Sequence, residues 1–232
     1  MSRGYVLAGV GFGYHRDAPV LTCDDLRIGP GLTLLLGPNG AGKSTLMKLL
    51  AGVERPAKGT IALDGIDLWQ DEVESRRQLA YVPEQPDLTP YASVREVIRL
   101  VASLRSVSLA EGEAALERVG LAAVAGRSVR ELSMGQRRRA VLAAAFIGQP
   151  DTLLLDEPLE TLDRSMRETL LDWLGHRVQA GATVLVSTHE IEPFLAQAAG
   201  IITVVAGAVR SMGLPADPAT RREAAEAASR PT

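Results

Sequence analysis

The chain has 232 residues, of which 46% are hydrophobic and 23% are charged, so it is long and apolar enough to close a large core. Its 25 Lys and Arg residues stand against 28 Asp and Glu residues, and the formal charge of -3 gives no reason to expect a nucleic-acid partner. The single cysteine, Cys23, excludes an internal disulfide and a cysteine-based zinc site, and we expect it to be a small buried hydrophobe. We find no signal peptide and no run of ~20 apolar residues, so we expect a cytoplasmic chain that does not cross a membrane by itself.

Short apolar runs bounded by turn residues recur along the chain. Residues 5–28 and 59–68 carry Gly and Asp turns that are typical of antiparallel strands. Unbroken apolar runs, which are typical of strands buried on both faces, occupy residues 32–36, 79–82, 152–155, 183–186 and 201–205. A helical pattern over 162–178 separates two of these runs. The order strand, helix, strand predicts a parallel sheet with helices on its faces.

The middle third of the sequence, residues 93–148, has helix signals and no convincing strand. Three serines have the capping-box spacing to a Glu or Gln three residues later: Ser93, Ser108 and Ser133. We therefore predict an α/β fold, with a mostly parallel sheet, an N-terminal antiparallel β subdomain and a helical insertion. The glycine-rich segment 37–45, which has the P-loop pattern, predicts a P-loop NTPase core for this fold. Residues 1–213 are expected to form one domain whose helical subdomain covers about 86–150, and residues 214–232 a C-terminal helix or tail.

A glycine-rich loop follows the apolar run 32–36 and precedes a helical pattern. It consists of Gly37, Pro38, Asn39, Gly40, Ala41, Gly42, Lys43, Ser44 and Thr45. The glycines allow backbone N–H groups to turn toward phosphate oxygens, and the start of the following helix attracts anions. Lys43 is expected to reach the β- and γ-phosphates and the Ser44 hydroxyl to bind Mg²⁺, so this loop predicts a nucleotide site.

Two carboxylates, Asp156 and Glu157, end the apolar run 152–155. Ligands of parallel sheets bind beyond the carboxyl ends of the strands, so both side chains should reach the same crevice as the glycine-rich loop. Asp156 would orient Mg²⁺ through water, and Glu157 could accept a proton from the attacking water.

Taken together, these motifs resemble the ATP-binding cassette (ABC) ATPases along nearly the whole of residues 5–213. The order of residues 132–136, 154–158, 162–163 and 187–189 resembles that family's signature loop, acidic strand end, D-loop and switch histidine. The resemblance implies ATP and Mg²⁺ as ligands, His189 as the switch residue and Asp163 as part of the D-loop. It also implies that Tyr14 stacks on adenine, although Phe12 is a competitor and Tyr14 could equally fill the core.

The signature segment can also be interpreted physically, because Ser133 and Gln136 form a capping box around the unobstructed N–H of Gly135. The family resemblance implies that this helix end faces the γ-phosphate bound to a second copy. Two ATP molecules would then lie between two head-to-tail domains, in a homodimer or a heterodimer.

The sequence departs from the family at several positions. Glu84 stands where the family usually has a glutamine, and we place Glu84 at the metal site, with Gln85 as the alternative after a one-residue shift. Met134 replaces a glycine of the signature. The run Arg137 to Arg139 is expected on a solvated or dimer-facing helix surface.

These patterns predict the ATP-binding and ATP-hydrolysing subunit of an ABC transporter. A separate transmembrane permease subunit would dock near residues 84–100 and the helical insertion, which places the chain on the inner face of the cell membrane. The alternative is a soluble ABC-type ATPase that acts as a clamp or switch on nucleic acid or ribosomes. A GTP-binding switch is disfavoured because the sequence has no guanine-reading Asn-Lys-x-Asp segment.

Overall fold

A computed structural model describes residues 3–15, 18–85, 88–215 and 217–229. Its strands are β1 Tyr5–Phe12, β2 Leu21–Ile28, β3 Gly31–Leu36, β4 Lys58–Leu63, β5 Ile66–Asp67, β6 Leu79–Val82, β7 Thr152–Asp156, β8 Thr183–Ser187, β9 Ala198–Val205 and β10 Ala208–Gly213. Its α-helices are α1 Lys43–Leu50, α2 Glu72–Arg76, α3 Val94–Leu104, α4 Leu109–Arg118, α5 Met134–Phe146, α6 Arg164–Gln179, α7 Glu192–Leu195 and α8 Pro218–Ser229. The expected start of the helical subdomain at residue 86 and the last tail residues 230–232 lie outside the described residues.

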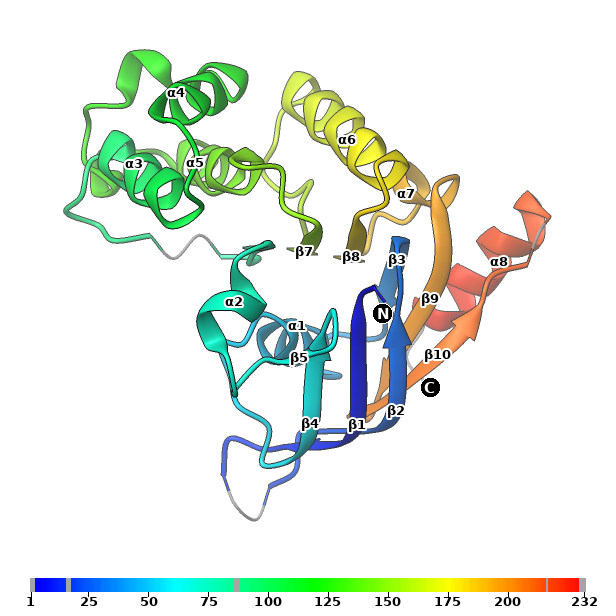
Figure 1. Ribbon diagram of the computed structural model, residues 1–232. Coiled ribbons are helices and arrows are strands. Elements are labelled where there is room, and N and C mark those ends of the chain that lie inside the picture. Colours follow the sequence, from blue (N-terminus) through cyan, green and yellow to red (C-terminus); the bar gives the residue numbers. More distant parts are fainter. Residues whose placement is uncertain (1–2, 16–17, 86–87, 216, 230–232) are drawn as a thin grey trace.

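All described strands belong to one sheet with the order β5-β4-β1-β2-β10-β9-β3-β8-β7-β6 (Figure 1). Strands β9, β3, β8, β7 and β6 pair in parallel. Their apolar runs are buried on both faces, as the unbroken hydrophobicity predicts; every residue of β7 and β8 is buried. The carboxyl ends of these strands therefore meet at one edge of the sheet.

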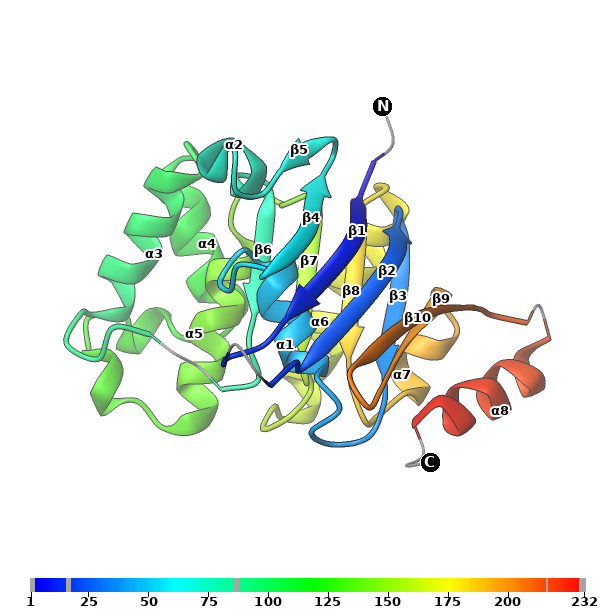
Figure 2. The same ribbon diagram turned by 90° about the horizontal axis from the view of Figure 1, so that it is seen from below.

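The N-terminal part of the sheet is antiparallel, with β1 between β2 and β4. The hairpin β9–β10 joins it to the parallel part, because β10 pairs with β9 on one side and with β2 on the other. Helix α1 lies behind the antiparallel strands in Figure 2 and packs in the core between both parts of the sheet, where Leu46 and Leu49 join one cluster with Leu7 of β1 and Leu154 of β7. The predicted fold class is confirmed.

Helices α3, α4 and α5 gather on one side of the sheet (green in Figure 1). The capping boxes at Ser93 and Ser133 have both reciprocal hydrogen bonds, and Ser108 caps α4. Ser128 forms a further capping box at the 3-10 turn Val129–Glu131. Helix α8 lies at the opposite side in Figure 2 and buries Ala225 against α7, β3 and β9.

Candidate active site

The glycine-rich loop joins the end of β3 to the start of α1, as predicted. Gly37 has φ 150°, and a Cβ at this position would lie 2.2 Å from the Val204 carbonyl oxygen, so only glycine fits. Gly42, with φ 113°, precedes the first residue of α1. The Lys43 ammonium donates hydrogen bonds to the carbonyls of Gly37 at 2.8 Å and Pro38 at 3.2 Å, which folds its side chain back over the loop.

A hollow of about 730 Å³ opens at this loop. Predicted site residues that line it are Tyr14, Asn39, Gly40, Gly42, Lys43, Ser44, Thr45, Glu84, Asp156, Glu157 and His189. Gly37, Pro38 and Ala41 belong to the same loop but are not part of the lining. The structure thus gathers at one edge of the sheet residues that lie up to 175 positions apart in the chain.

Glu157 and His189 lie together in the hollow. The main-chain N–H of His189 donates to Oε2 of Glu157 at 3.3 Å, and Nε2 of the His189 ring lies 3.5 Å from Oε1 of Glu157. Burial raises the pKa of Glu157 above its ordinary value, and the His189 N–H opposes this shift. Oε1 is buried and has no hydrogen-bond donor among the described residues. A carboxylate with a free, desolvated oxygen is suited to accept a proton.

The donors expected to hold Mg²⁺ fit a hard cation. Ser44, Glu84 and Asp156 present hydroxyl and carboxylate oxygens to the same hollow, and Asp156 is 2% exposed. The buried Ser187 hydroxyl next to them has no hydrogen-bond partner. Among the described residues, no three His, Cys, Asp or Glu side chains form a metal cluster, so an ion here would also need oxygens from the phosphates.

Glu84 and Gln85 differ in the spaces that they line. Glu84 lines both the hollow at the glycine-rich loop and a neighbouring groove, whereas Gln85 lines the groove and not the hollow. This geometry favours Glu84 over Gln85 at the metal position.

Tyr14 and Phe12 also differ in their surroundings. Tyr14 is 51% exposed, lines the hollow and lies 3.3 Å from Thr45 between hydroxyl oxygens. Phe12 is buried and supports the Tyr14 ring edge-on, with ring centroids 5.0 Å apart. The exposed ring of Tyr14 is therefore the one that can meet a base.

The signature residues do not line this hollow. Ser133 is exposed at the start of α5, where its hydroxyl accepts from the Gln136 N–H at 3.2 Å and its own N–H donates to Oε1 of Gln136 at 3.0 Å. Gly135 lies beside the carbonyl of Thr161. Asp163 caps α6 and forms an ion pair with Arg139. The signature and the D-loop thus lie next to each other, away from the P-loop of their own chain.

The prediction of a solvated arginine run was wrong for Arg138. Its side chain is 1% exposed, and its guanidinium donates to main-chain carbonyls behind the hollow. Arg137 and Arg139 are half-buried. Arg137 donates to the carbonyls of Val129 and Arg130, and Arg139 donates to the carboxylate of Asp163.

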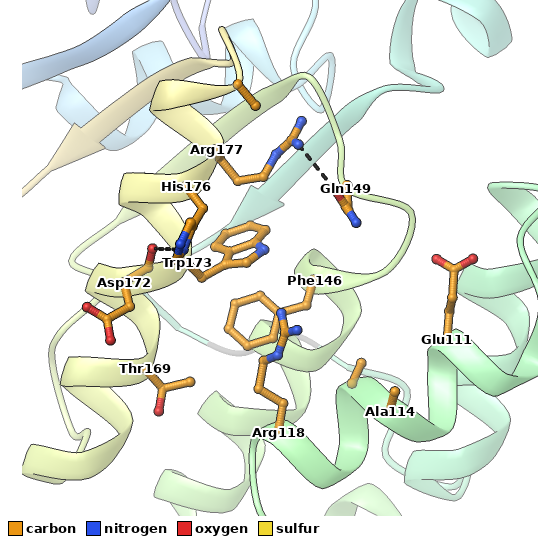
Figure 3. A pocket seen from close by; sticks show the side chains of 12 residues that line it. Glu111, Ala114, Arg118, Phe146, Gln149, Thr169, Asp172, Trp173, His176 and Arg177 are labelled. Carbon is orange, nitrogen blue, oxygen red and sulfur yellow. Dashed lines mark hydrogen bonds between the residues drawn. The ribbon is translucent and has the colours of Figure 1, made fainter.

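A second hollow of about 550 Å³ lies between α4, α5 and α6 (Figure 3). The rings of Phe146 and Trp173 pack at its base with centroids 4.5 Å apart, and His176 binds the Asp172 carbonyl of its own helix. Arg177 points toward Gln149. The side chains of this second hollow already contact one another or their own main chain. We therefore assign the nucleotide to the hollow at the glycine-rich loop.

A phosphate-binding loop follows the parallel strand β3, a carboxylate pair stands at the end of the parallel strand β7, and the signature serine caps helix α5. Together these features define a P-loop nucleotide-binding protein. The family model described as ABC transporter matches residues 25–160. The chain belongs to the ABC transporter family, and its fold is that of the ATP-binding cassette.

Curated relatives include proteins of both transport directions. The chain is 38% identical to the "Nod factor export ATP-binding protein I" of Cupriavidus metallidurans over 77% of its length and 60% of that protein. It is also 38% identical to the "Sulfate/thiosulfate import ATP-binding protein CysA" of Synechococcus elongatus, over 83% of this chain and 58% of the relative. The chain thus spans 60% and 58% of the length of these two relatives.

Solved structures of cassettes match the whole fold. An ATP-binding subunit of an ABC transporter superimposes with a TM-score of 0.84 at 27% identity, over 97% of this chain and 95% of that chain. A bacterial ABC transporter cassette solved as a dimer gives a TM-score of 0.80 at 25% identity, over 92% of this chain and 100% of that chain. None of the helices among the described residues has both the length and the apolar composition that a bilayer crossing requires.

Proposed function

We propose that this chain is the ATP-hydrolysing subunit of an ABC transporter. The observation that carries the proposal is the split of the site: Lys43, Asp156 and Glu157 share one hollow, while the exposed Ser133 and the half-buried Gly135 lie outside it. A nucleotide held by the P-loop of one chain would leave its γ-phosphate open to the helix end of another chain. Two chains arranged head to tail would then enclose two ATP molecules.

Each group has a defined task in this mechanism. Lys43 and the backbone N–H groups of the loop hold the phosphates, and the amino end of α5 of the second chain completes the site. Glu157 accepts the proton of the attacking water, and His189 holds that carboxylate through its N–H. Ser44, Glu84 and Asp156 would hold Mg²⁺, which neutralises phosphate charge when it is bound.

The partner proposed for the other face is a membrane-spanning permease. A groove of about 780 Å³ lies between the sheet and the helical insertion, and its lining includes Val53, Tyr81, Leu88 and Val101. This groove shares Glu84 and Asp156 with the nucleotide hollow, so a helix end docked in the groove would lie next to both metal-facing carboxylates. Docking of this kind would hold the chain at the inner face of the membrane.

Glu157→Gln tests the proposed function. Loss of a general base typically lowers turnover by about 10²- to 10⁴-fold, and we expect this loss in kcat with ATP still bound. The variant should also form a dimer on ATP, which size-exclusion chromatography with light scattering would detect. Wild-type turnover in this variant would show that Glu157 is not the base.

Glu160→Gln is the matched control. Glu160 lines the same hollow but is exposed and does not contact His189 in the described structure. We expect its kcat to stay within about threefold of the wild type, since its carboxylate is exposed and has no part in the proposed hydrolysis.

A further inference from the structure

The Arg138 side chain connects helix α5 to two loops at the carboxyl edge of the sheet. Nη1 donates to the carbonyl of Pro83 and, at 3.0 Å, to that of Glu84. Nη2 donates to the carbonyls of Asp156 at 2.8 Å and Glu157 at 2.6 Å. The first pair follows β6 and the second ends β7 and begins the next loop, and these strands are neighbours in the sheet. One guanidinium therefore holds both strand ends.

The charges around Arg138 favour this position. Burial lowers the pKa of its guanidinium, while the carboxylates of Asp156, Glu160, Glu157 and Glu84 raise it. An arginine stays charged in such surroundings, since even a lowered guanidinium pKa lies far above neutral pH. The side chain thus places a fixed cation behind an acidic cluster that would otherwise repel itself, and it does so without occupying the nucleotide hollow.

The backbone of Glu157 needs support of this kind. Its φ is 46°, a left-handed conformation that costs a non-glycine residue free energy. The Glu157 N–H donates to the Ser187 carbonyl at 2.8 Å, and the Glu157 carbonyl accepts from Arg138. With both ends of the residue fixed, the direction of its carboxylate is fixed as well.

We infer that Arg138 is a positioning residue that sets Glu84 and Glu157 relative to each other and ties both to the signature helix. The inference rests on the proposed function of Glu157. Arg138 lies in the same helix that Ser133 caps, so a displacement of α5 when a second chain closes on Ser133 would move both loops together. Without the guanidinium, the loops would lose their common attachment to α5.

Arg177 provides a matched control. It is also buried, at 8% exposure, and its Nη2 donates to the Pro150 carbonyl at 2.9 Å near the amino end of β7. Arg138→Lys and Arg177→Lys each keep the charge and lose the planar fork of donors, so they should lower the melting temperature by comparable amounts. They differ in which end of β7 they release.

Hydrogen exchange of the full chain without nucleotide measures this difference directly. In folded Arg138→Lys we expect the main-chain amides of Glu84, Gln85, Asp156, Glu157, Leu159 and Glu160 to exchange about tenfold faster or more. Arg177→Lys should instead affect the amides of Gln149, Asp151 and Thr152. Unchanged protection of both loops in Arg138→Lys would overturn the inference. Because this readout does not involve ATP, it is independent of the assignment of Glu157 as the base.

Steady-state kinetics then test the effect on hydrolysis. We expect Arg138→Lys to lower kcat by about 10- to 100-fold with KM for ATP within about threefold of the wild type, since a misplaced catalytic group costs on the order of 10²-fold. Arg138→Met should lower kcat further, because it removes both the charge and the guanidinium donors that bind the four carbonyls. A loss of kcat no larger than that of Arg177→Lys, or an equal loss through KM, would contradict a positioning role. A wild-type rate in Glu157→Gln would instead refute the role of Glu157 as the base, which belongs to the proposed function.

Discussion

Lys43 is the single residue on which the affinity for nucleotide depends most. Its ammonium is 8% exposed and binds only the carbonyls of its own loop, Gly37 and Pro38, among the described hydrogen bonds. Hydrogen bonds to charged groups are worth about 1.5–3 kcal/mol each, so losing two to phosphate predicts an affinity loss of roughly 10²- to 10⁴-fold. Isothermal titration of Lys43→Ala with ATP would measure it. Lys48→Ala, in the last turn of the same helix, should bind ATP as the wild type does, and unchanged affinity in Lys43→Ala would contradict the site.

Cys23 makes a prediction about chemical reactivity. It is 2% exposed in β2, which confirms that it is a buried small hydrophobe. Burial, and secondarily the carboxylates of Asp24 and Asp25, raises the pKa of its thiol to about 11. Because only the thiolate reacts, we expect alkylation of the folded chain at pH 8 to be more than about 100-fold slower than in guanidinium chloride. Rapid labelling of the native chain, followed by mass spectrometry, would contradict this burial.

Single residues also mark the limit of what the sequence could predict. The contacts of Glu157 and His189 follow from their places at the ends of two adjacent parallel strands, which the apolar runs reveal. Arg138 could not be predicted in the same way. Three arginines in a row cover most of the circumference of a helix, so only the packing of α5 against β6 and β7 decides which one is buried.

At the scale of elements, the amino end of α5 carries a prediction of its own. Ser133→Arg would remove a cap worth about 1 kcal/mol and place a bulky cation where the second chain should approach. We expect ATP affinity at the intact P-loop to persist, while the ATP-dependent dimer seen in a Glu157→Gln background disappears. Titration calorimetry and light scattering would measure the two effects separately.

Ser108→Arg is the control for this element. Ser108 caps α4 through the Glu111 N–H at 3.3 Å and lies far from the signature in the chain, so its replacement should cost similar stability and leave the dimer intact. If both variants prevented dimer formation equally, the loss would reflect helix stability and not the proposed contact.

Elements differed in how well the sequence predicted them. Strand β6 has the predicted bounds, and β3, β7 and β8 differ by one residue, because strands buried on both faces are apolar throughout. Strand β10 and helix α2 were not predicted. Most of β10 is exposed, and it is held by pairing with β9, a tertiary contact that leaves no hydrophobic pattern in the sequence.

At the scale of the whole molecule, a head-to-tail dimer predicts complementation between defective chains. Lys43→Ala destroys a P-loop and Ser133→Arg destroys a signature, so each variant alone has no intact site. A mixed dimer joins both defects in one site and leaves the other site complete. When equal amounts of the two variants pair at random, half of the dimers are mixed, and one of the two sites in each mixed dimer is intact. About a quarter of all sites are then active, so mixing should restore about a quarter of the wild-type rate per chain. An ATPase assay across mixing ratios should peak at equal amounts, and no recovery at any ratio would contradict a site shared between chains.

The contact between Phe146 and Trp173 crosses the boundary between the helical insertion and the sheet-bound helices, because Phe146 ends α5 and Trp173 lies in α6. The chain has only one other tryptophan, Trp69, which lies between the guanidinium groups of Arg55 and Arg76. A Trp69→Phe chain would therefore carry a single indole at this boundary. Its fluorescence emission would report, in real time and without an added dye, whether the helical insertion moves relative to α6 when nucleotide binds.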